Sequence, residues 1–322
     1  MPRRAELSVL ITSVSQKVPL VAAVRAAHQR LGLAGKIVGA DSAADAIGRY
    51  FVDQFWQMPQ LEALSVAELI DFCLKNRIGA IIPTRDGELA FFAKQRNALK
   101  KKGISVMVSS LEAVQTCRDK YQFFRSLHEM GFPAIPAALK LEDVPAKRYV
   151  VKDRFGAGAK CMGVDLDRKQ ARAIAAQLKD PIYEPFYPGD EYSIDVYVAL
   201  TGEVKGCVVR NRDKVVNGES QITTSLRHPE LETLCGKMAE KLGLYGHAVF
   251  QAICERGKVM GVIECNPRFG GASTLSLACG LNSFEWFLRE VLEDPLPAMR
   301  RKKNALRQVR YPIDLILPAE GA

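Results

Sequence analysis

Short apolar runs and amphipathic stretches alternate along the first third of the chain. Residues 7–12 (LSVLIT) and 36–41 (KIVGAD) are apolar runs, and residues 18–31 between them carry apolar positions at helical spacing. After an irregular passage, an alternation of helix, strand, helix and strand returns over residues 65–109. Strands that alternate with helices are typical of a parallel sheet covered on both faces. We therefore predict an α/β domain over residues 1–110.

The pattern changes after residue 110. One helix is predicted over residues 111–131, and beyond it apolar and polar positions alternate in longer strands joined by hairpin turns. Helical spacing returns at residues 228–244, and again at residues 275–292, where Gly280 is the expected point of interruption. The last apolar run, residues 311–317, could return to a sheet or pair with another subunit, so a homodimer is one expectation.

One predicted hairpin lies late in the chain. The apolar segments HAVFQAIC and VMGVIEC flank residues 255–258, a short polar group that contains a glycine where a tight turn needs one. A two-residue loop and a four-residue loop both place Cys254 opposite Val259. If this register continues, Gln251 lies opposite Val262.

The same hairpin carries candidate metal ligands. Because strand side chains alternate between two faces, Gln251, Glu264 and Asn266 are expected on one face. One carboxylate and two amide oxygens suit a hard cation such as Mg²⁺. Arg268 follows shortly after, where its guanidinium could meet an anion held by the metal. An ordinary solvated strand end can show the same Glu-x-Asn pattern, so both interpretations stay open on these residues alone.

A glycine-rich turn is the second candidate site. A predicted strand leads through Lys152 into residues 153–160 (DRFGAGAK), where glycines would let backbone N–H groups approach a polyphosphate. Many such turns are only turns, and the Walker spacing and the protein-kinase signatures are absent. The first strand-to-helix turn, residues 12–19, has no glycine. A Rossmann dinucleotide site is therefore not expected there.

Two more groups of residues have two interpretations each. Arg210 and Arg212 lie in a polar segment after a strand, and they could clamp a substrate carboxylate or be surface arginines. Thr84, Asp86 and Glu88 follow a predicted strand at the end where open sheets tend to bind ligands. Acidic residues are also favourable at the start of any helix, so these three could be structural.

Composition and charge narrow the class of protein. The chain has 322 residues, 48% apolar and 25% charged, with no apolar run long enough to span a bilayer. Its eight cysteines form no C-x-x-C pair, which is typical of reduced thiols. We expect a cytoplasmic protein with no membrane partner. Of the net charge of +9, six positive charges lie in residues 300–310, and no nucleic-acid-binding motif accompanies them. A nucleic acid is therefore not an expected partner.

Taken in chain order, these residues resemble the ATP-grasp superfamily, and within it the short proteins similar to one half of the carbamoyl phosphate synthetase large subunit. The resemblance covers nearly the whole chain, including the strings PTRDGEL and YEPFYPGDEYSIDVY. It implies a parallel α/β pre-ATP-grasp domain over residues 1–110, followed by a two-lobed ATP-grasp fold of the α+β class. The small lobe with its phosphate loop would span residues 111–185, and the large lobe with the metal site residues 186–322.

The resemblance also implies a role for each candidate residue. Basic side chains, the glycine loop, backbone groups at the adenine edge and a ribose carboxylate would bind the nucleotide: Lys120, Lys152, Gly156, Gly158, Glu184, Phe186 and Glu191. The metal ligands would be Gln251, Glu264 and Asn266. The catalytic residues would be Arg268, Lys152 and Arg212. The cofactors would be ATP and Mg²⁺, with Mn²⁺ as a possible substitute.

The implied enzyme is an ATP-dependent carboxylate–amine ligase. A small carboxylate or amino acid would attack the γ-phosphorus of ATP, and an amine would then capture the acyl phosphate. Only one ATP-grasp unit is visible and no glutaminase, so complete carbamoyl phosphate synthesis by this polypeptide alone is not expected. Two alternatives stay open, a phosphotransferase that stops at a carboxyl phosphate or carbamate-type product and a non-catalytic ATP-binding module.

Overall fold

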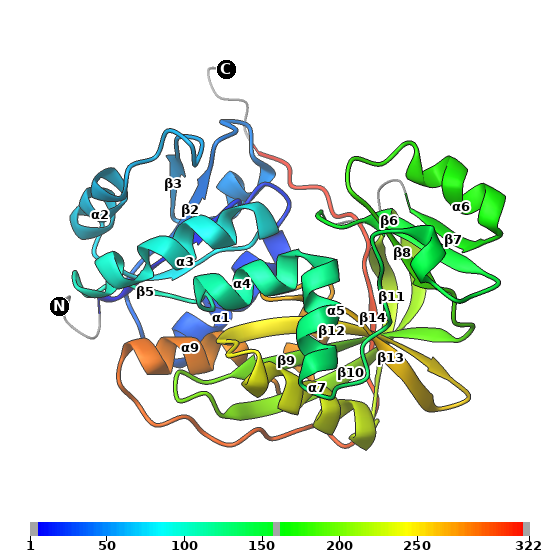
Figure 1. The fold of residues 1–322 in the computed structure, drawn as a ribbon. Helices are drawn as coiled ribbons and strands as arrows, with labels where there is room; N and C mark the ends of the chain where they lie inside the picture. The colour runs from blue at the N-terminus through cyan, green and yellow to red at the C-terminus, as the bar shows by residue number, and fades with distance from the viewer. Residues whose placement is uncertain (1–5, 157–161, 318–322) are drawn as a thin grey trace.

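The computed structural model describes residues 6–156 and 162–317 (Figure 1). Gly158 therefore lies outside the described residues. The first part of the chain folds as a parallel sheet in the order β3-β2-β1-β4-β5. Its strands are β1 (Ser8–Thr12), β2 (Ile37–Asp41), β3 (Gln54–Gln57), β4 (Ile78–Ile82) and β5 (Ser105–Val106). Its helices are α1 (Val18–Arg30), the 3-10 helix η2 (Ile47–Phe51), α2 (Val66–Lys75) and α3 (Asp86–Lys100). The predicted α/β domain is confirmed, and β3 lies in the passage that had seemed irregular.

The predicted helix over residues 111–131 is two helices, α4 (Leu111–Arg118) and α5 (Lys120–Glu129). The break lies at Asp119, which has an extended backbone and accepts hydrogen bonds from the N–H groups of Tyr121 and Gln122. An acidic side chain that caps a helix in this way competes with continuous helical hydrogen bonding. Asp119 thus begins α5 where the apolar spacing alone predicted no interruption.

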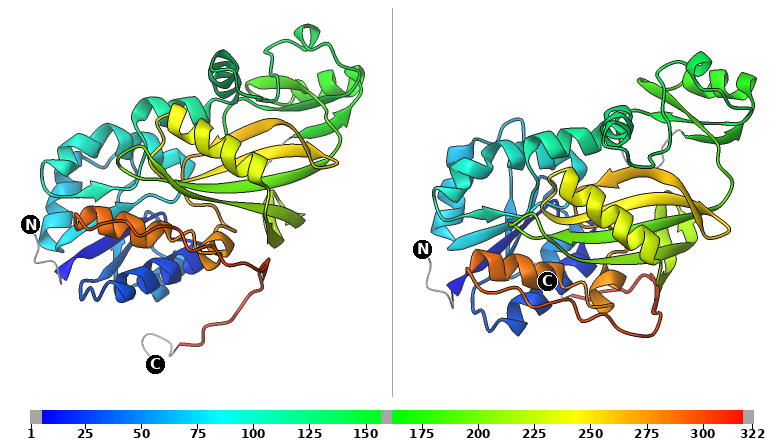
Figure 2. Two further views of the ribbon diagram at one scale, coloured as in Figure 1. Left: turned by 90° about the horizontal axis from the view of Figure 1, so that it is seen from below. Right: turned by 60° about the horizontal axis from the view of Figure 1, so that its bottom comes forward.

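A small three-stranded sheet, in the order β7-β6-β8, follows these helices. It consists of β6 (Tyr149–Asp153), β7 (Gly163–Leu166) and β8 (Pro181–Pro185), with the 3-10 helix η3 (Leu141–Asp143) and α6 (Arg168–Ala175) beside it. The core of this unit is small, formed chiefly by buried residues of β6, α6 and η3. It stands at the far end of the molecule from the parallel sheet (Figure 2).

A six-stranded sheet, in the order β13-β12-β9-β10-β11-β14, forms the centre of the molecule. Its strands are β9 (Asp190–Val198), β10 (Val204–Val216), β11 (Glu219–Leu226), β12 (Gly246–Glu255), β13 (Lys258–Asn266) and β14 (Arg307–Val309), and all pairs are antiparallel. The polar segment around Arg212, predicted to follow a strand, instead continues β10 into a hairpin with β11. Residues 311–317 join no strand and are exposed, and the strand that returns to the sheet is β14.

Helices cover both faces of the large sheet. On one face α7 (Pro229–Lys241) packs on β9 and β10, and residues of α4 and α5 share its core. On the other face lie α8 (Thr274–Ala278) and α9 (Ser283–Val291), separated at Gly280 as predicted, and they join the parallel sheet and α1 in one core. No helix in the described ranges is both long and apolar enough to cross a membrane.

Candidate functional site

A cavity of about 780 Å³ lies between the small sheet and the large sheet. It is lined by all of the predicted site residues that fall within the described ranges: Lys120, Lys152, Gly156, Glu184, Phe186, Glu191, Arg212, Gln251, Glu264, Asn266 and Arg268. These residues come from α5, both sheets and the loops between them. The fold therefore brings into one cavity residues that are up to 148 positions apart in the chain.

A buried ion pair stands on the small-sheet side of the cavity. Lys152 on β6 and Glu184 on β8 are both almost fully buried, and their Nζ and Oε1 atoms are 2.8 Å apart. Burial raises the pKa of the Glu184 carboxyl, and the neighbouring Lys152 ammonium opposes that shift. Because each charge would be costly to bury alone, the pair fixes Lys152 at the cavity wall. There its ammonium could also reach a nucleotide phosphate.

Lys120 connects the start of α5 to the glycine-rich turn. Its Nζ donates to the carbonyl oxygen of Gly156 at 2.8 Å, and its backbone N–H donates to the carbonyl of Arg154 at 3.1 Å. The Arg154 guanidinium in turn forms a two-pronged ion pair with Asp119, at 2.7 and 2.5 Å. Burial lowers the pKa of Lys120, although the charge of Glu264 partly offsets that effect. The helix start and the turn thus form one basic unit facing Glu264.

The backbone after β8, where the prediction places an adenine edge, has one N–H engaged within the protein and one without a partner among the described residues. The N–H of Phe186 already donates to the carbonyl of Arg148 at 2.9 Å, so it has no hydrogen left for a ligand. Tyr187 follows it and lines the cavity, and the N–H of Tyr187 has no partner among the described residues. The adenine edge at this strand end stays a prediction, and the sequence pattern could not show that the N–H of Phe186 is engaged with Arg148, just before β6.

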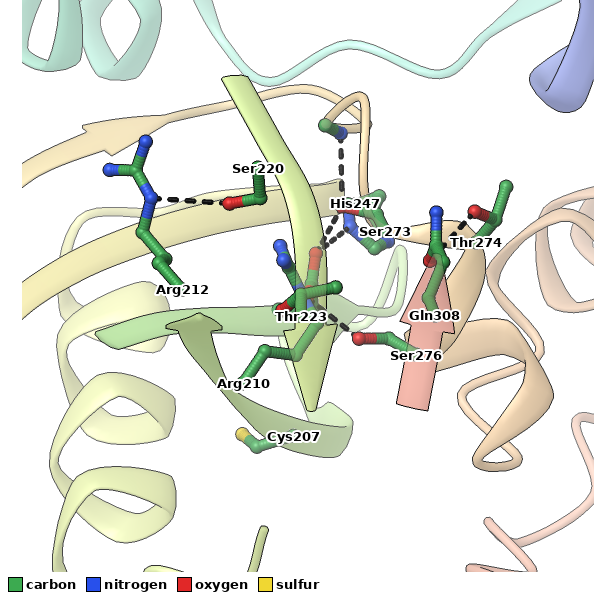
Figure 3. Close-up of polar contacts among 12 residues, drawn as sticks. Cys207, Arg210, Arg212, Ser220, Thr223, His247, Ser273, Thr274, Ser276 and Gln308 are labelled. Carbon is green, nitrogen blue, oxygen red and sulfur yellow. Dashed lines mark hydrogen bonds and ion pairs between the residues drawn. The ribbon is translucent and has the colours of Figure 1, made fainter. Parts of the chain in front are cut away.

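Arg212, predicted to be catalytic, is held by three protein acceptors. Its Nε donates to Ser220 Oγ at 3.2 Å, one terminal nitrogen pairs with Glu191, and the other donates to the carbonyl of Gly218 at 2.8 Å (Figure 3 shows the contact with Ser220). Gln251 also donates to Glu191. Arg212 therefore holds the ribose candidate Glu191 and the β10–β11 turn, and three of its five N–H groups are engaged in these contacts.

The predicted metal ligands do share one face of the β12–β13 hairpin, but their register differs from the expected one. Cys254 lies opposite Val259 as predicted, whereas Gln251 pairs with Glu264 and not with Val262. The β12–β13 pairing contains two bulges, and each inserts one extra residue into β13. The register therefore shifts by two residues along the hairpin, which the geometry of the turn alone cannot predict. The bulges bring Gln251 directly opposite Glu264.

The donor set of this hairpin fits a hard cation. The amide nitrogen of Asn266 donates to Glu264 at 3.2 Å, and that of Gln251 donates to Glu191. Both amide oxygens and the second Glu264 oxygen are therefore left to face a ligand, as oxygen-loving Mg²⁺ requires. The set includes only one carboxylate of its own, and within the described ranges no three His, Cys, Asp or Glu residues form a metal-binding group.

Arg268 is held by the parallel α/β domain. Its Nε and one terminal nitrogen donate to the two oxygens of Asp86 at 2.8 and 2.5 Å, a contact between residues 182 positions apart. Glu88 has the structural role that was one of the two interpretations, since it is buried and caps α3 by accepting from the N–H groups of Thr84 and Arg85. Of the acids at this helix start, Asp86 therefore belongs to the site.

Arg210, one of the two arginines that could clamp a carboxylate, also lines the cavity, as do two cations that the sequence analysis did not consider, Lys17 and Arg310. Burial lowers the pKa of Lys17, and the neighbouring Arg268 acts in the same direction. Arg310 pairs with Glu219 at 2.7 Å. Lys17 lies in the glycine-free turn before α1, and Arg310 comes from the basic run near the carboxyl end. No local pattern marks either as a site residue, because only the fold brings these segments to the cavity.

Comparison with known proteins agrees with this architecture. One family model, described as the N-terminal domain of PylC-like proteins, matches residues 9–107, and a second, described as ATP-grasp in the biosynthetic pathway with Ter operon, matches residues 177–312. Among curated proteins, the carbamoyl phosphate synthase large chain of Thermotoga neapolitana is 23% identical over 270 residues, which is 74% of this chain. The matched region is about a quarter, 24%, of the length of that relative.

Solved structures show the same fold at low sequence identity. The biotin carboxylase domain of Hydrogenobacter thermophilus 2-oxoglutarate carboxylase, a dimer in complex with MgADP, ADP and bicarbonate, superposes with a TM-score of 0.72 at 17% identity, covering 93% of this chain and 73% of that one. An L-amino acid ligase from Bacillus licheniformis gives a TM-score of 0.68 at 18% identity, covering 90% and 75%. The two consecutive family matches show that the chain combines a PylC-like N-terminal domain over residues 9–107 with an ATP-grasp domain over residues 177–312.

Proposed function

We propose that this protein is an ATP-dependent carboxylate–amine ligase that acts on a small carboxylate or amino acid through an acyl phosphate. One observation carries the proposal. A single cavity joins the two basic side chains of the small-lobe side, Lys120 and Lys152, to the oxygen donors around Glu264 and to Arg268. A protein that only held ATP would need neither a complete cation site nor an arginine beside it.

The residues of this chain divide the work as follows. Lys120 and Lys152 hold the phosphates of ATP, while Glu264 and the amide oxygens of Gln251 and Asn266 hold Mg²⁺. When bound there, the cation would supply neutralisation of the negative charge that develops during phosphoryl transfer. Arg268 orients and stabilises the group in transfer, which is catalysis by positioning and electrostatics. The carboxylate oxygen forms a bond to phosphorus as the bond to ADP breaks, and the amine then attacks the acyl carbon and releases phosphate.

A second candidate has one specific observation in its favour. The curated relative is a carbamoyl phosphate synthase chain, although the match spans about a quarter of its length. A phosphotransferase on the same scaffold would stop at a carboxyl phosphate or carbamate-type product. It would therefore form ADP from ATP and a carboxylate with no requirement for an amine.

The experiment that tests the proposal is Mg²⁺-dependent ADP release by the purified protein. A panel of amino acids and small carboxylates is assayed with and without amines or ammonia. The ligase requires both a carboxylate and an amine for full turnover, whereas turnover at the same rate with the carboxylate alone identifies the phosphotransferase. Glu264→Gln removes the metal carboxylate at constant size and should abolish ADP release, while Glu129→Gln, on the exposed face of α5, serves as the matched control.

A further inference from the structure

A row of side chains crosses the large sheet beneath the cavity. Arg210 on β10 lies directly opposite Ser193 on β9, which is opposite Gln251 on β12, which in turn is opposite Glu264 on β13. Directly opposed residues of antiparallel strands point to the same face. The candidate metal ligands therefore occupy one end of this row, and Arg210 occupies the other.

Arg210 is fixed from below by a buried polar cluster. Its Nε donates to Asp195, a fully buried carboxylate that also accepts from His247 Nε2 at 2.9 Å and from Ser276 Oγ at 2.7 Å. Ser273 donates to the same carboxylate. Figure 3 shows Arg210, His247, Ser273 and Ser276 close to one another, although they come from different elements. Burial alone would raise the pKa of Asp195, but the Arg210 guanidinium and then His247 hold it well below its ordinary value.

The outer side of the same guanidinium has no protein partner. Only the Nε of Arg210 makes a contact among the described residues, and both terminal nitrogens are without an acceptor there. The residue is nevertheless 2% exposed and lines the cavity. Among the described residues neither terminal nitrogen is a fully buried atom without a partner, so this edge of the guanidinium reaches the cavity and can meet a ligand there. The free edge of a guanidinium matches the two oxygens of a carboxylate.

The position of Arg210 separates this anion from the nucleotide. Lys120 and Lys152 stand on the small-lobe side, next to β13 and its metal ligands. Arg210 is two strands away from Gln251, which corresponds to roughly 10 Å between their backbones at the usual strand spacing. The transferred phosphoryl group has its own arginine, Arg268. The anion that meets Arg210 therefore comes from the substrate and not from ATP.

We propose that Arg210 binds a second carboxylate of the substrate, one that is not phosphorylated, so that the protein acts on dicarboxylic compounds. This inference rests on the proposed function, since it requires that another carboxylate be activated at the metal end of the row. Asp195 and its partners are positioning residues that hold the guanidinium edge toward the cavity. The guanidinium of Arg210 thereby selects substrates that are long enough to reach from Arg210 to the metal ligands.

The test is calorimetric titration of the whole protein, loaded with MgADP, with linear dicarboxylates from malonate to pimelate. Each dicarboxylate is paired with the monocarboxylate of the same chain length. The inference predicts that at least one dicarboxylate binds about tenfold or more tightly than its monocarboxylate. Arg210→Lys keeps the buried charge beside Asp195 but removes the paired N–H donors of the guanidinium. It should therefore weaken dicarboxylate binding by about tenfold or more.

A second variant guards against a change in folding. Ser193→Asp places a carboxylate opposite Arg210 and leaves the buried cluster intact. The new carboxylate should pair with the terminal nitrogens of Arg210 and so also abolish dicarboxylate binding. Arg125→Lys, an exposed exchange of the same kind on α5, should change nothing. Binding that persists in both cavity variants, or no dicarboxylate binding to the wild-type protein, overturns the role of Arg210. A failure to bind MgADP would instead contradict the proposed function.

Discussion

The contact between Asp86 and Arg268 predicts that the N-terminal domain takes part in phosphoryl transfer. The two side chains are 23% and 17% exposed and share two charge-assisted hydrogen bonds. Asp86→Asn keeps the shape and one acceptor oxygen but removes the charge and one of the two bonds. A hydrogen bond to a charged group contributes about 1.5–3 kcal/mol. This is the free energy available to hold Arg268 in its position.

If that free energy orients Arg268 in the transition state, its loss has a calculable effect on rate. Each ~1.4 kcal/mol corresponds to a tenfold change, so Asp86→Asn should lower kcat for ADP release by roughly ten- to a hundredfold. The KM for ATP should change little, because neither residue is assigned to the nucleotide. The assay is steady-state ADP release, combined with thermal unfolding to verify that the variant is folded.

The control for this prediction is Glu129→Gln. It makes the same chemical change in an ion pair with Arg125, whose side chains are 63% and 52% exposed. Such exposed pairs contribute little, and the control should retain its rate and its melting temperature. An Asp86→Asn protein that is folded and turns over at the wild-type rate would refute the idea that Asp86 orients Arg268.

Three further predictions concern the framework of the site. Asp195→Asn should lower the free energy of unfolding by about 3–5 kcal/mol, because it leaves the buried guanidinium of the cluster without its anion. The pKa of Asp195 is lower in the folded protein than its value of about 3.9 in the unfolded chain. The stabilisation by Asp195 is therefore complete above a pH of about 3.9 and is lost as the pH falls through the lower, folded-state pKa. Urea unfolding of the wild-type protein and the Asp195→Asn variant between pH 3 and pH 8 measures this stabilisation. Burial lowers the pKa of Lys120, so its ammonium loses its proton at a lower pH than an exposed lysine, whose pKa is about 10.4. MgATP binding should therefore weaken as the pH rises towards that range. Lys120→Arg should remove this pH dependence of binding in a titration series. Gly189→Ala should lower the melting temperature, because the backbone there has φ 138° and an added Cβ would lie 2.4 Å from the carbonyl oxygen of Cys254; an unchanged melting temperature would show that the chain relaxes without cost.

The sequence was sufficient for those parts of the fold that rest on local periodicity. The alternation of apolar and helical stretches predicted the parallel domain, and the glycine turn predicted the β12–β13 hairpin with Gln251, Glu264 and Asn266 on one face. The sequence analysis did not predict structural features that run against the spacing of apolar residues. Asp119 breaks a helix that its apolar spacing supports, and β3 is a short, half-buried strand with a weak pattern.

The site was predictable where its residues follow one another in a motif, and not where the tertiary fold decides. Arg210 and Arg212 are two positions apart on the same face of a strand, so alternation cannot distinguish them. Arg212 is held by Glu191 and the following turn, whereas Arg210 is buried because Ser273 and Ser276, more than sixty residues later, donate to Asp195 beneath it. The same holds for the contact of Asp86 with Arg268, which joins two domains.

The central claim is that a substrate carboxylate attacks the γ-phosphorus of ATP, and an isotope measurement tests it most directly. A carboxylate that supports ADP release is supplied with ¹⁸O in both oxygens, and the phosphate formed during turnover with an amine is analysed by mass spectrometry. An acyl phosphate intermediate transfers one ¹⁸O atom to each phosphate, because the bridging oxygen leaves with phosphorus when the amine attacks the acyl carbon. Phosphate that contains no ¹⁸O from the carboxylate would contradict the ligase mechanism.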